Sequence, residues 1–201
     1  MPRSTYHHGD LRRALLAEAT GLARSGGPDA VILREVARRL GVSPAAMYRH
    51  VPDRDALLGE VARLARLDLA RRMLDEVGRV QEADPRSRSV LKFKAIGRGY
   101  LRYAEEEPNL LAVAFLPIEP PDDSVEDPNP WNVLSMALDE LTAAGAIPLE
   151  RRSGAEIIAW SAIHGFAILR AGRAFDVSGA RNPDPEAVLD AIVRSLDVQS
   201  S

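Results

Sequence analysis

A short stretch, "GVSPAAMYRHV" (residues 41–51), places small residues directly before side chains that can bind a polyanion. The small residues are Pro44, Ala45 and Ala46. A hydroxyl, a guanidinium and an imidazole follow, on Tyr48, Arg49 and His50. Small residues allow a helix to approach closely and to contact thymine methyl groups, and the polar groups suit hydrogen bonds to phosphates or base edges. The stretch therefore predicts a helix that enters the major groove of double-stranded DNA.

The residues around this stretch predict how the helix is held. The Ser43 hydroxyl can cap the helix by accepting from an amide of its first turn. Val42 and Met47 have the spacing of a hydrophobic staple, which fixes the direction of the chain. Gly41 allows a sharp turn after a helix expected over 33–40, so the whole reads as helix, tight turn, helix. The alternative, a short packing helix with exposed polar residues, does not explain why cap, staple, turn and basic residues occur together.

The charges of the chain are divided unevenly, although the net charge of all 201 residues is only −3. Residues 1–60 contain nine arginines and seven acidic residues, a net charge of +2. The remainder contains 17 basic and 22 acidic residues, a net charge of −5. A basic end on an acidic body indicates that one end of the protein meets a polyanion.

The sequence lacks the residues and motifs that several kinds of site require. The chain has no cysteine, which excludes disulfides and thiolate ligands. It has no HExxH or GxSxG motif and no phosphate-cradling glycine loop, so we expect no enzyme activity and no cofactor. The adjacent pair His7 and His8 could bind a metal, but a capping or phosphate-contacting role before the first helix fits better. The apolar runs are too short for a signal peptide or a membrane span, so we expect a cytoplasmic protein without a membrane partner.

The periodicity of apolar residues is helical almost throughout and predicts an all-α fold of about nine helices. They are expected over about 10–24, 33–40, a short helix from 44, a long helix after the N-cap Asp53, and then about 87–105, 109–115, 130–145, 149–172 and 185–198. Residues 116–130 contain five prolines and five acids and predict an irregular loop. We expect a three-helix helix-turn-helix DNA-binding domain over 1–52 and a larger helical effector-binding and dimerisation domain over 53–201.

The segment from Tyr6 to Leu58, with its frame "LREVARRLGVS…YRH…ALL", resembles the N-terminal DNA-binding domain of the tetracycline-repressor (TetR) family. The resemblance covers about a quarter of the chain. It implies phosphate contacts by four residues: Ser43, Tyr48, His50 and Arg54. It implies groove-facing positions for Pro44, Ala45, Ala46 and Arg49, and it turns Arg34 toward the DNA backbone.

Two positions depart from the family pattern. Ile32 stands where the family usually has a Ser or Thr that caps the second helix and touches phosphate. Val51 stands where a Phe usually packs under the recognition helix. The first departure removes one phosphate contact per half-site, and the second leaves a smaller wedge that affects the tilt of the recognition helix.

The C-terminal part has the features of a dimerisation domain. Twelve of the 17 residues in 155–171 are apolar, which predicts a helix buried on all sides and covered partly by a second copy of the chain. Glycine within a helix costs ~1 kcal/mol relative to alanine, so Gly165 indicates close helix approach. The resemblance implies a homodimer in which the last two long helices of each subunit form a four-helix bundle. Its expected contacts are Gly165, Ile168, Leu189, Ile192, Val193 and Leu196. Two recognition helices about 34 Å apart then read a palindromic operator.

The triplet Trp160, His164 and Gly165 is similar to the W…HG motif of one TetR subgroup. It leaves two interpretations open: Trp160 and His164 line an effector cavity, or they are core residues. The expected cavity residues are Phe93, Tyr100, Leu111, Phe115, Trp131, Met136, Trp160 and His164. Such a cavity suits a hydrophobic or aromatic small molecule. We therefore expect a regulator, a repressor released by its effector; the alternative is a DNA-binding protein of this fold without an effector.

Overall fold

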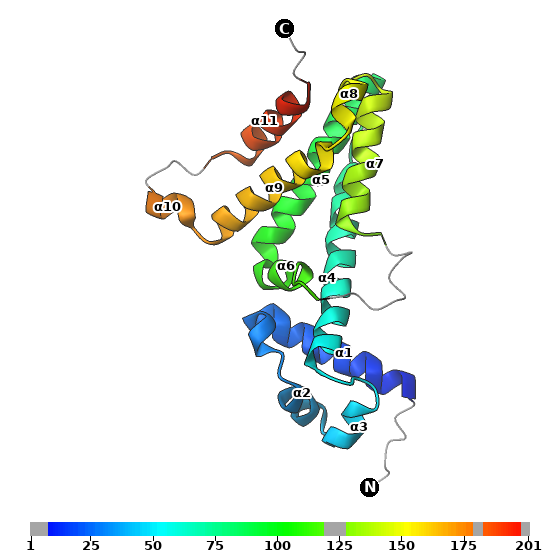
Figure 1. Cartoon of the computed structure of the whole chain (residues 1–201), viewed down its shortest axis with the longest axis vertical. Coiled ribbons are helices and arrows are strands. Elements are labelled where there is room, and N and C mark those ends of the chain that lie inside the picture. The colour runs from blue at the N-terminus through cyan, green and yellow to red at the C-terminus, as the bar shows by residue number, and fades with distance from the viewer. Residues whose placement is uncertain (1–7, 119–127, 179–182, 198–201) are drawn as a thin grey trace. The chain divides into compact units, whose positions relative to one another are not determined.

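The computed structural model describes residues 8–118, 128–178 and 183–197 (Figure 1). These residues form eleven α-helices and one 3-10 helix, η1, and contain no strand, which confirms the all-α class. The elements are α1 (His8–Gly26), η1 (Pro28–Ala30), α2 (Leu33–Leu40), α3 (Pro44–Tyr48), α4 (Arg54–Val77), α5 (Pro85–Glu106), α6 (Pro108–Ala114), α7 (Pro130–Ala143), α8 (Leu149–Arg152), α9 (Ala155–Ala171), α10 (Ala174–Ser178) and α11 (Pro185–Asp197). His7 and most of the proline-rich acidic loop lie outside the described residues.

The chain divides into two compact units. The first comprises the described part of Met1–Arg66 and Glu107–Asp127, and the second that of Leu67–Glu106 and Pro128–Ser201. The first unit thus contains α6 and the first half of α4 in addition to the expected helix-turn-helix. The boundary between 52 and 53 remains a prediction about where the DNA-binding function ends. No helix of the described segments is long and apolar enough to cross a membrane.

In the first unit, α1 to α3 lie together with the beginning of α4 (Figure 1). These elements share one apolar core. Its buried side chains are Leu11, Leu15, Leu22, Val36, Met47, Val51, Leu57, Leu58 and Val61. α6 packs against α1 and η1. Asn109 Nδ2 donates to the Arg24 carbonyl at the end of α1 (3.0 Å), and Arg66 Nη1 donates to the Ala114 carbonyl at the end of α6 (2.8 Å). Carbonyls at helix ends lack partners within the helix, so these two contacts complete α1 and α6.

The predicted caps of the helices around the recognition helix are confirmed. The Ala46 amide donates to Ser43 Oγ (3.2 Å), as expected of an N-cap. Gly41 has φ 65°, the left-handed conformation in which glycine ends a helix, and its amide donates to carbonyls of α2. The Ala56 amide donates to Asp53 Oδ1 (2.8 Å), so Asp53 caps α4. These three positions set the turns on both sides of α3.

In the second unit, α5 packs against α7, α9 and α11 (Figure 1). Two glycines make the approach of neighbouring helices possible. A Cβ at Gly99 would lie 2.7 Å from the Met73 Cα, in the backbone of α4. A Cβ at Gly97 would overlap the Leu189 Cδ2 of α11. At residues 97–99, α5 is therefore in close contact with α11 on one side and with α4 on the other.

Three features of the second unit differ from the expectation. The single helix expected over 149–172 is divided into α8 and α9, because Gly154 has φ 78° and interrupts the helix. The short helix α10 was not predicted. In addition, α9 is not buried on all sides within the single chain. Its exposed apolar side chains are Ile157, Ile158, Ile168 and Leu169.

Candidate functional site

The recognition helix α3 is anchored by one side chain and exposes the others. Met47 is only 1% exposed and points into the core of the first unit. The opposite side of the helix and its flanks are exposed at Ser43, Pro44, Ala45, Tyr48 and Arg49. Ala46 and His50 are half-buried. The structure thus brings the predicted groove-facing and phosphate-contacting side chains of this stretch together on the surface of one short helix.

The basic residues of α2 are not equivalent. Glu35 accepts from Arg38 Nε (2.8 Å) and from Arg39 Nε (2.7 Å), and these hydrogen bonds lower the pKa of its carboxyl to about 2. Arg39 also donates to Glu18 of α1 (3.0 Å). The charges of Arg38 and Arg39 are therefore balanced by carboxylates. Arg34, which the resemblance turns toward DNA, is exposed near the start of the same helix.

Arg54 has a structural role that the sequence did not predict. Its Nε donates to the Val31 carbonyl (2.9 Å) and its Nη2 to the Pro28 carbonyl (2.7 Å). These contacts join the first residue of α4 to the segment that leads into α2. Arg54 thereby positions the helix-turn-helix, and a phosphate contact would have to use its remaining N–H groups.

The two departures from the family pattern have visible effects. Ile32 is the N-cap residue of α2, gives no side-chain cap, and is 55% exposed. Val51 is 5% exposed, so it packs into the core in spite of its smaller side chain. The start of α2 is therefore uncapped, whereas the base of α3 is filled.

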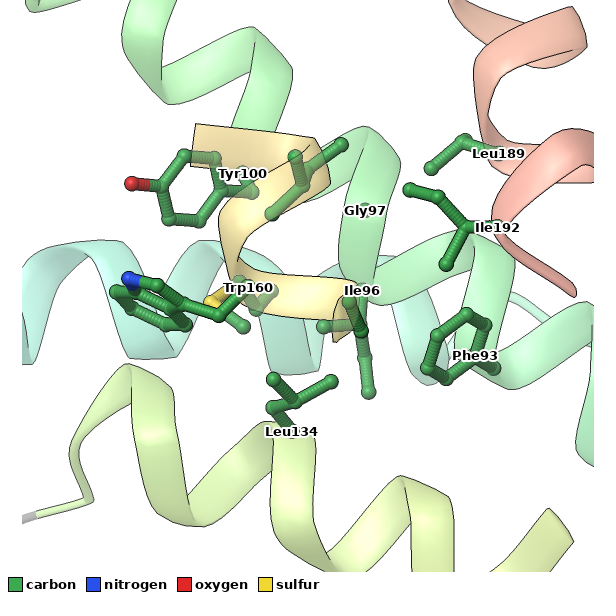
Figure 2. A pocket seen from close by; sticks show the side chains of 11 residues that line it. Phe93, Ile96, Gly97, Tyr100, Leu134, Trp160, Leu189 and Ile192 are labelled. Carbon is green, nitrogen blue, oxygen red and sulfur yellow. The ribbon is translucent and has the colours of Figure 1, made fainter. Parts of the chain in front are cut away.

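The second unit contains a cavity with apolar walls, built from five helices (Figure 2). Its empty volume is about 360 Å³, which includes space open to solvent. The lining residues are Met73 of α4, Phe93, Ile96, Gly97 and Tyr100 of α5, Leu134 of α7, Ala159, Trp160 and Ile163 of α9, and Leu189 and Ile192 of α11. The part of this volume that a water-sized molecule can occupy is only about 30 Å³, whereas ligand pockets in proteins typically have roughly 300–1,000 Å³, so even a compact ligand has to widen the cavity as it enters.

An aromatic cluster forms one end of the cavity. Tyr100 and Trp160 meet edge to face, with ring centroids 5.6 Å apart. The Tyr100 hydroxyl and His164 Nδ1 are joined by a hydrogen bond of 2.6 Å. Burial raises the pKa of the Tyr100 hydroxyl and lowers the pKa of His164, so both groups are neutral at pH 7. His164 thus supports Tyr100 and is not itself among the lining residues.

The other expected cavity residues lie elsewhere. Phe93, Tyr100 and Trp160 line the cavity as predicted. Trp131 has its ring centroid 5.8 Å from that of Trp160 but is 42% exposed, and Met136 is 69% exposed. Leu111 and Phe115 belong to the first unit, whereas the cavity is built from the second. The prediction named mainly large and aromatic residues and therefore did not include the aliphatic residues of the cavity wall. In the sequence, these residues are indicated only by the helical spacing of apolar positions on α5, α9 and α11.

The expected dimer contacts fall into two groups. Leu189, Ile192 and Leu196 of α11 are buried within the single chain, and the first two line the cavity, so in this conformation they are not available to a second chain. Val193 is half-buried. In contrast, Ile168 of α9 is 47% exposed, and a Cβ at Gly165 would meet no atom within 4 Å. Of the expected contacts, those open to a partner therefore lie on α9.

Two family models match the chain. The model of bacterial regulatory proteins of the tetR family matches residues 15–61, and the model of the tetracyclin repressor-like C-terminal domain matches residues 93–196. The first match includes α2, α3 and the beginning of α4, and the second includes ten of the eleven cavity-lining residues. A comparison with curated protein sequences finds no match.

Solved structures share the fold over nearly the whole chain. A protein with unknown function from Rhodococcus sp. RHA1 is 31% identical, with 98% of this chain and 100% of that chain covered and a TM-score of 0.76. A TetR transcriptional regulator from Streptomyces coelicolor is 18% identical, with 94% and 99% covered and a TM-score of 0.59. The R. erythropolis transcriptional repressor QsdR, from the TetR family, is 19% identical, with 97% and 98% covered and a TM-score of 0.53.

The last two identities are low and show a common fold alone. The C-terminal family model, in contrast, matches more than half of the 201 residues, and the N-terminal model matches the helix-turn-helix. The capped recognition helix with its exposed polar side chains agrees with the N-terminal match. The chain therefore belongs to the TetR family of transcriptional regulators, which are DNA-binding proteins and not enzymes.

Proposed function

We propose that this protein is a ligand-responsive repressor, which binds a palindromic operator as a homodimer and leaves it when a small hydrophobic or aromatic effector binds. The observation that carries the proposal is the apolar cavity of the second unit, where a compact effector can enter between the helices by widening the space that they enclose. A repressor that acts on chromosomal DNA works in the cytoplasm, where we place this protein.

In this proposal, α3 lies in the major groove. Pro44, Ala45, Ala46 and Arg49 face the bases, and Ser43, Tyr48 and His50 contact phosphates. The exposure of Tyr48 (51%) and Arg49 supports this division, because neither side chain is needed for the core. Arg34 adds a phosphate contact from α2, where Glu35 balances the neighbouring arginines.

The homodimer is proposed to form through α9. Ile157, Ile158, Ile168 and Leu169 are all more than 45% exposed on this one helix. Gly165 lies between them, and its lack of a Cβ is not required by any contact within the chain. A glycine in this position lets another helix approach closely, which supports pairing of α9 with α9 of a second copy.

The effector is proposed to act through α4, because this helix carries residues of both units. Leu57 and Leu58 belong to the core of the first unit, and Met73 lines the cavity of the second. A ligand that favours one position of Met73 shifts the population of α4 positions and thereby the DNA affinity.

The test begins with the DNA that the purified protein selects from a random pool. Fluorescence anisotropy then gives the affinity for this operator with and without compounds that bind the protein. The proposal expects an inverted-repeat site and at least about tenfold weaker binding with effector, a coupling of about 1.4 kcal/mol. A protein that binds the selected DNA equally well with every bound compound would instead be the regulator without an effector.

A further inference from the structure

The polar atoms at the cavity wall are few and are turned to one side. Among the eleven lining residues, the hydrogen-bonding side-chain groups are the Tyr100 hydroxyl and the Trp160 indole N–H. Figure 2 shows both groups pointing away from Leu189 and Ile192, which close the opposite end. The Tyr100 hydroxyl is already bonded to His164 Nδ1 at 2.6 Å. A ligand that needs this hydroxyl must therefore first break an existing buried hydrogen bond.

The charged residues next to the cavity are also paired. Lys94 of α5 lies 2.7 Å from Asp190 and 3.1 Å from Glu186, both of α11. Arg98, one turn further along α5, donates to both oxygens of Glu186. Two positive charges thus meet two negative charges, and they hold α11 against α5. None of these four residues lines the cavity, and a charged ligand finds no counterion among the described residues of its wall.

Resting on the sensor function proposed above, we propose that the cavity selects a compact, uncharged molecule without a hydrogen-bonding head group. The Tyr100 hydroxyl is already bonded to His164, and the Trp160 N–H points to the same side, away from Leu189 and Ile192. The charged residues of the α5–α11 ion pairs are not among the lining residues. A buried charge or hydroxyl without a partner loses its hydration without replacement, which is why charged and polar analogues are rejected.

Four probes of similar shape test this selectivity: p-xylene, p-cresol, p-toluate and 4-methylbenzylammonium. The Trp131→Phe protein leaves Trp160, at the cavity wall, as its single tryptophan, so its fluorescence reports occupancy of the cavity. We expect saturable binding of p-xylene, weaker binding of p-cresol by about tenfold, and no saturable binding of either ion. Binding of p-toluate or of the ammonium probe as tight as that of p-xylene would overturn the selectivity.

Two variants in the same background examine the hydrogen-bonded pair itself. Tyr100→Phe removes the hydroxyl, which the ligand does not use, so the ratio of p-cresol to p-xylene affinity stays within about twofold. His164→Ala removes the partner of the hydroxyl, so p-cresol gains on p-xylene by at least about threefold. Phe93→Leu changes an apolar wall and serves as the control with an unchanged ratio. A selective loss of p-cresol binding in Tyr100→Phe would show that the hydroxyl anchors the ligand and would refute the proposal.

The outcomes also separate this inference from the proposed function. Binding of the probes in a different order refutes the selectivity and leaves a ligand sensor. Absence of saturable binding by all four probes, with a folded protein by thermal unfolding, refutes the selectivity, and the anisotropy titrations of the selected operator then decide the sensor function separately.

Discussion

Arg54 donates a hydrogen bond to the carbonyl of Val31 (2.9 Å), and this contact ties the start of α4 to the residue before the N-cap of α2. The second bond of the same guanidinium, to Pro28, makes the contact a two-point clamp. A clamp of this kind fixes the direction of α2 and, through the turn at Gly41, of α3. The orientation of the recognition helix therefore depends on a side chain outside it.

Replacing Arg54 tests whether it positions the domain or contacts phosphate. Arg54→Gln should lower the free energy of unfolding by about 1–2 kcal/mol, because two backbone carbonyls lose a charged donor. DNA affinity should fall while the slope of log K against log salt stays unchanged, since a lost phosphate contact would reduce that slope by about one. Chemical denaturation and anisotropy titrations at several salt concentrations measure both quantities. A reduced slope with unchanged stability would make Arg54 a phosphate ligand instead.

Substitutions at two positions of the recognition helix should affect DNA affinity and sequence preference separately. Tyr48→Phe removes an exposed hydroxyl that we assign to phosphate, so binding should weaken by roughly fivefold on the operator and on random duplex alike. Ala45→Ser should change the preferred base instead, because this position faces the groove. Repeating the selection from a random pool with each variant measures the preference. A changed consensus for Tyr48→Phe would contradict the assignment.

The two glycines of α5 should respond differently to alanine. At Gly99 the new methyl meets the backbone of α4, which cannot move aside, so we expect a loss of about 2–3 kcal/mol in the free energy of unfolding. At Gly97 it meets the end of the Leu189 side chain, which can rotate into the cavity. The cost there should be below about 1 kcal/mol, since alanine also favours the helix. Thermal unfolding compares the two variants directly, and equal losses would show that α11 is held rigidly.

The exposed stripe of α9 should control the oligomeric state. Ile168→Glu places a charge where an apolar contact with a second chain is proposed, so dimer dissociation should become at least about tenfold easier. The fold of the single chain should be retained because this side chain is 47% exposed. Ala112→Glu, an exposed residue of α6 in the first unit, is the matched control. Analytical ultracentrifugation measures both, and an unchanged dimer in Ile168→Glu would move the interface away from this face.

Stability should depend on pH through His164. Burial lowers its pKa from the ordinary value of 6.5, so below that pH the unfolded chain binds a proton that the folded chain does not. Stability is therefore greatest above pH 6.5 and falls as the pH decreases toward the folded pKa. His164→Gln cannot titrate, so its melting temperature should change less between pH 7 and 5.5. Parallel pH profiles of the two proteins would refute this role.

The parts of the structure that depend on local sequence could be predicted. Ser43 and Asp53 cap their helices through side chains within one turn, so their roles follow from the residues next to them. The exposure of Tyr48 and Arg49 follows in the same way once Met47 is assigned to the core. Gly154 shows the limit of this reasoning. A glycine is tolerated within a helix or ends it, and only the backbone conformation, φ 78°, decides.

The cavity depends on contacts between distant helices and could be predicted only in part. Aromatic residues such as Phe93 and Trp160 stand out in a sequence, whereas Leu134 looks the same whether it lines a cavity or fills a core. The apolar stripe of α11 was expected to face a second chain. A stripe of this kind can pack equally well against helices of its own chain, as it does here. The contact that places Leu189 against α5 becomes visible only in the structure, where the Leu189 side chain packs at the position of the missing Gly97 side chain.

The charged residues of α2 are placed differently at its two ends, and its N-terminal end has no side-chain cap. Its two arginines near the C-terminal end are neutralised by Glu35 and Glu18, whereas Arg34 lies in the first turn together with the positive end of the helix dipole. A serine or threonine at the N-cap would accept a hydrogen bond from an amide of the first turn of α2, whereas the Ile32 side chain cannot accept one. Glu35 lies in the same first turn but is paired with Arg38 and Arg39. Arg34 is therefore the cation of α2 that its carboxylates leave for a phosphate, and its attraction weakens with added salt.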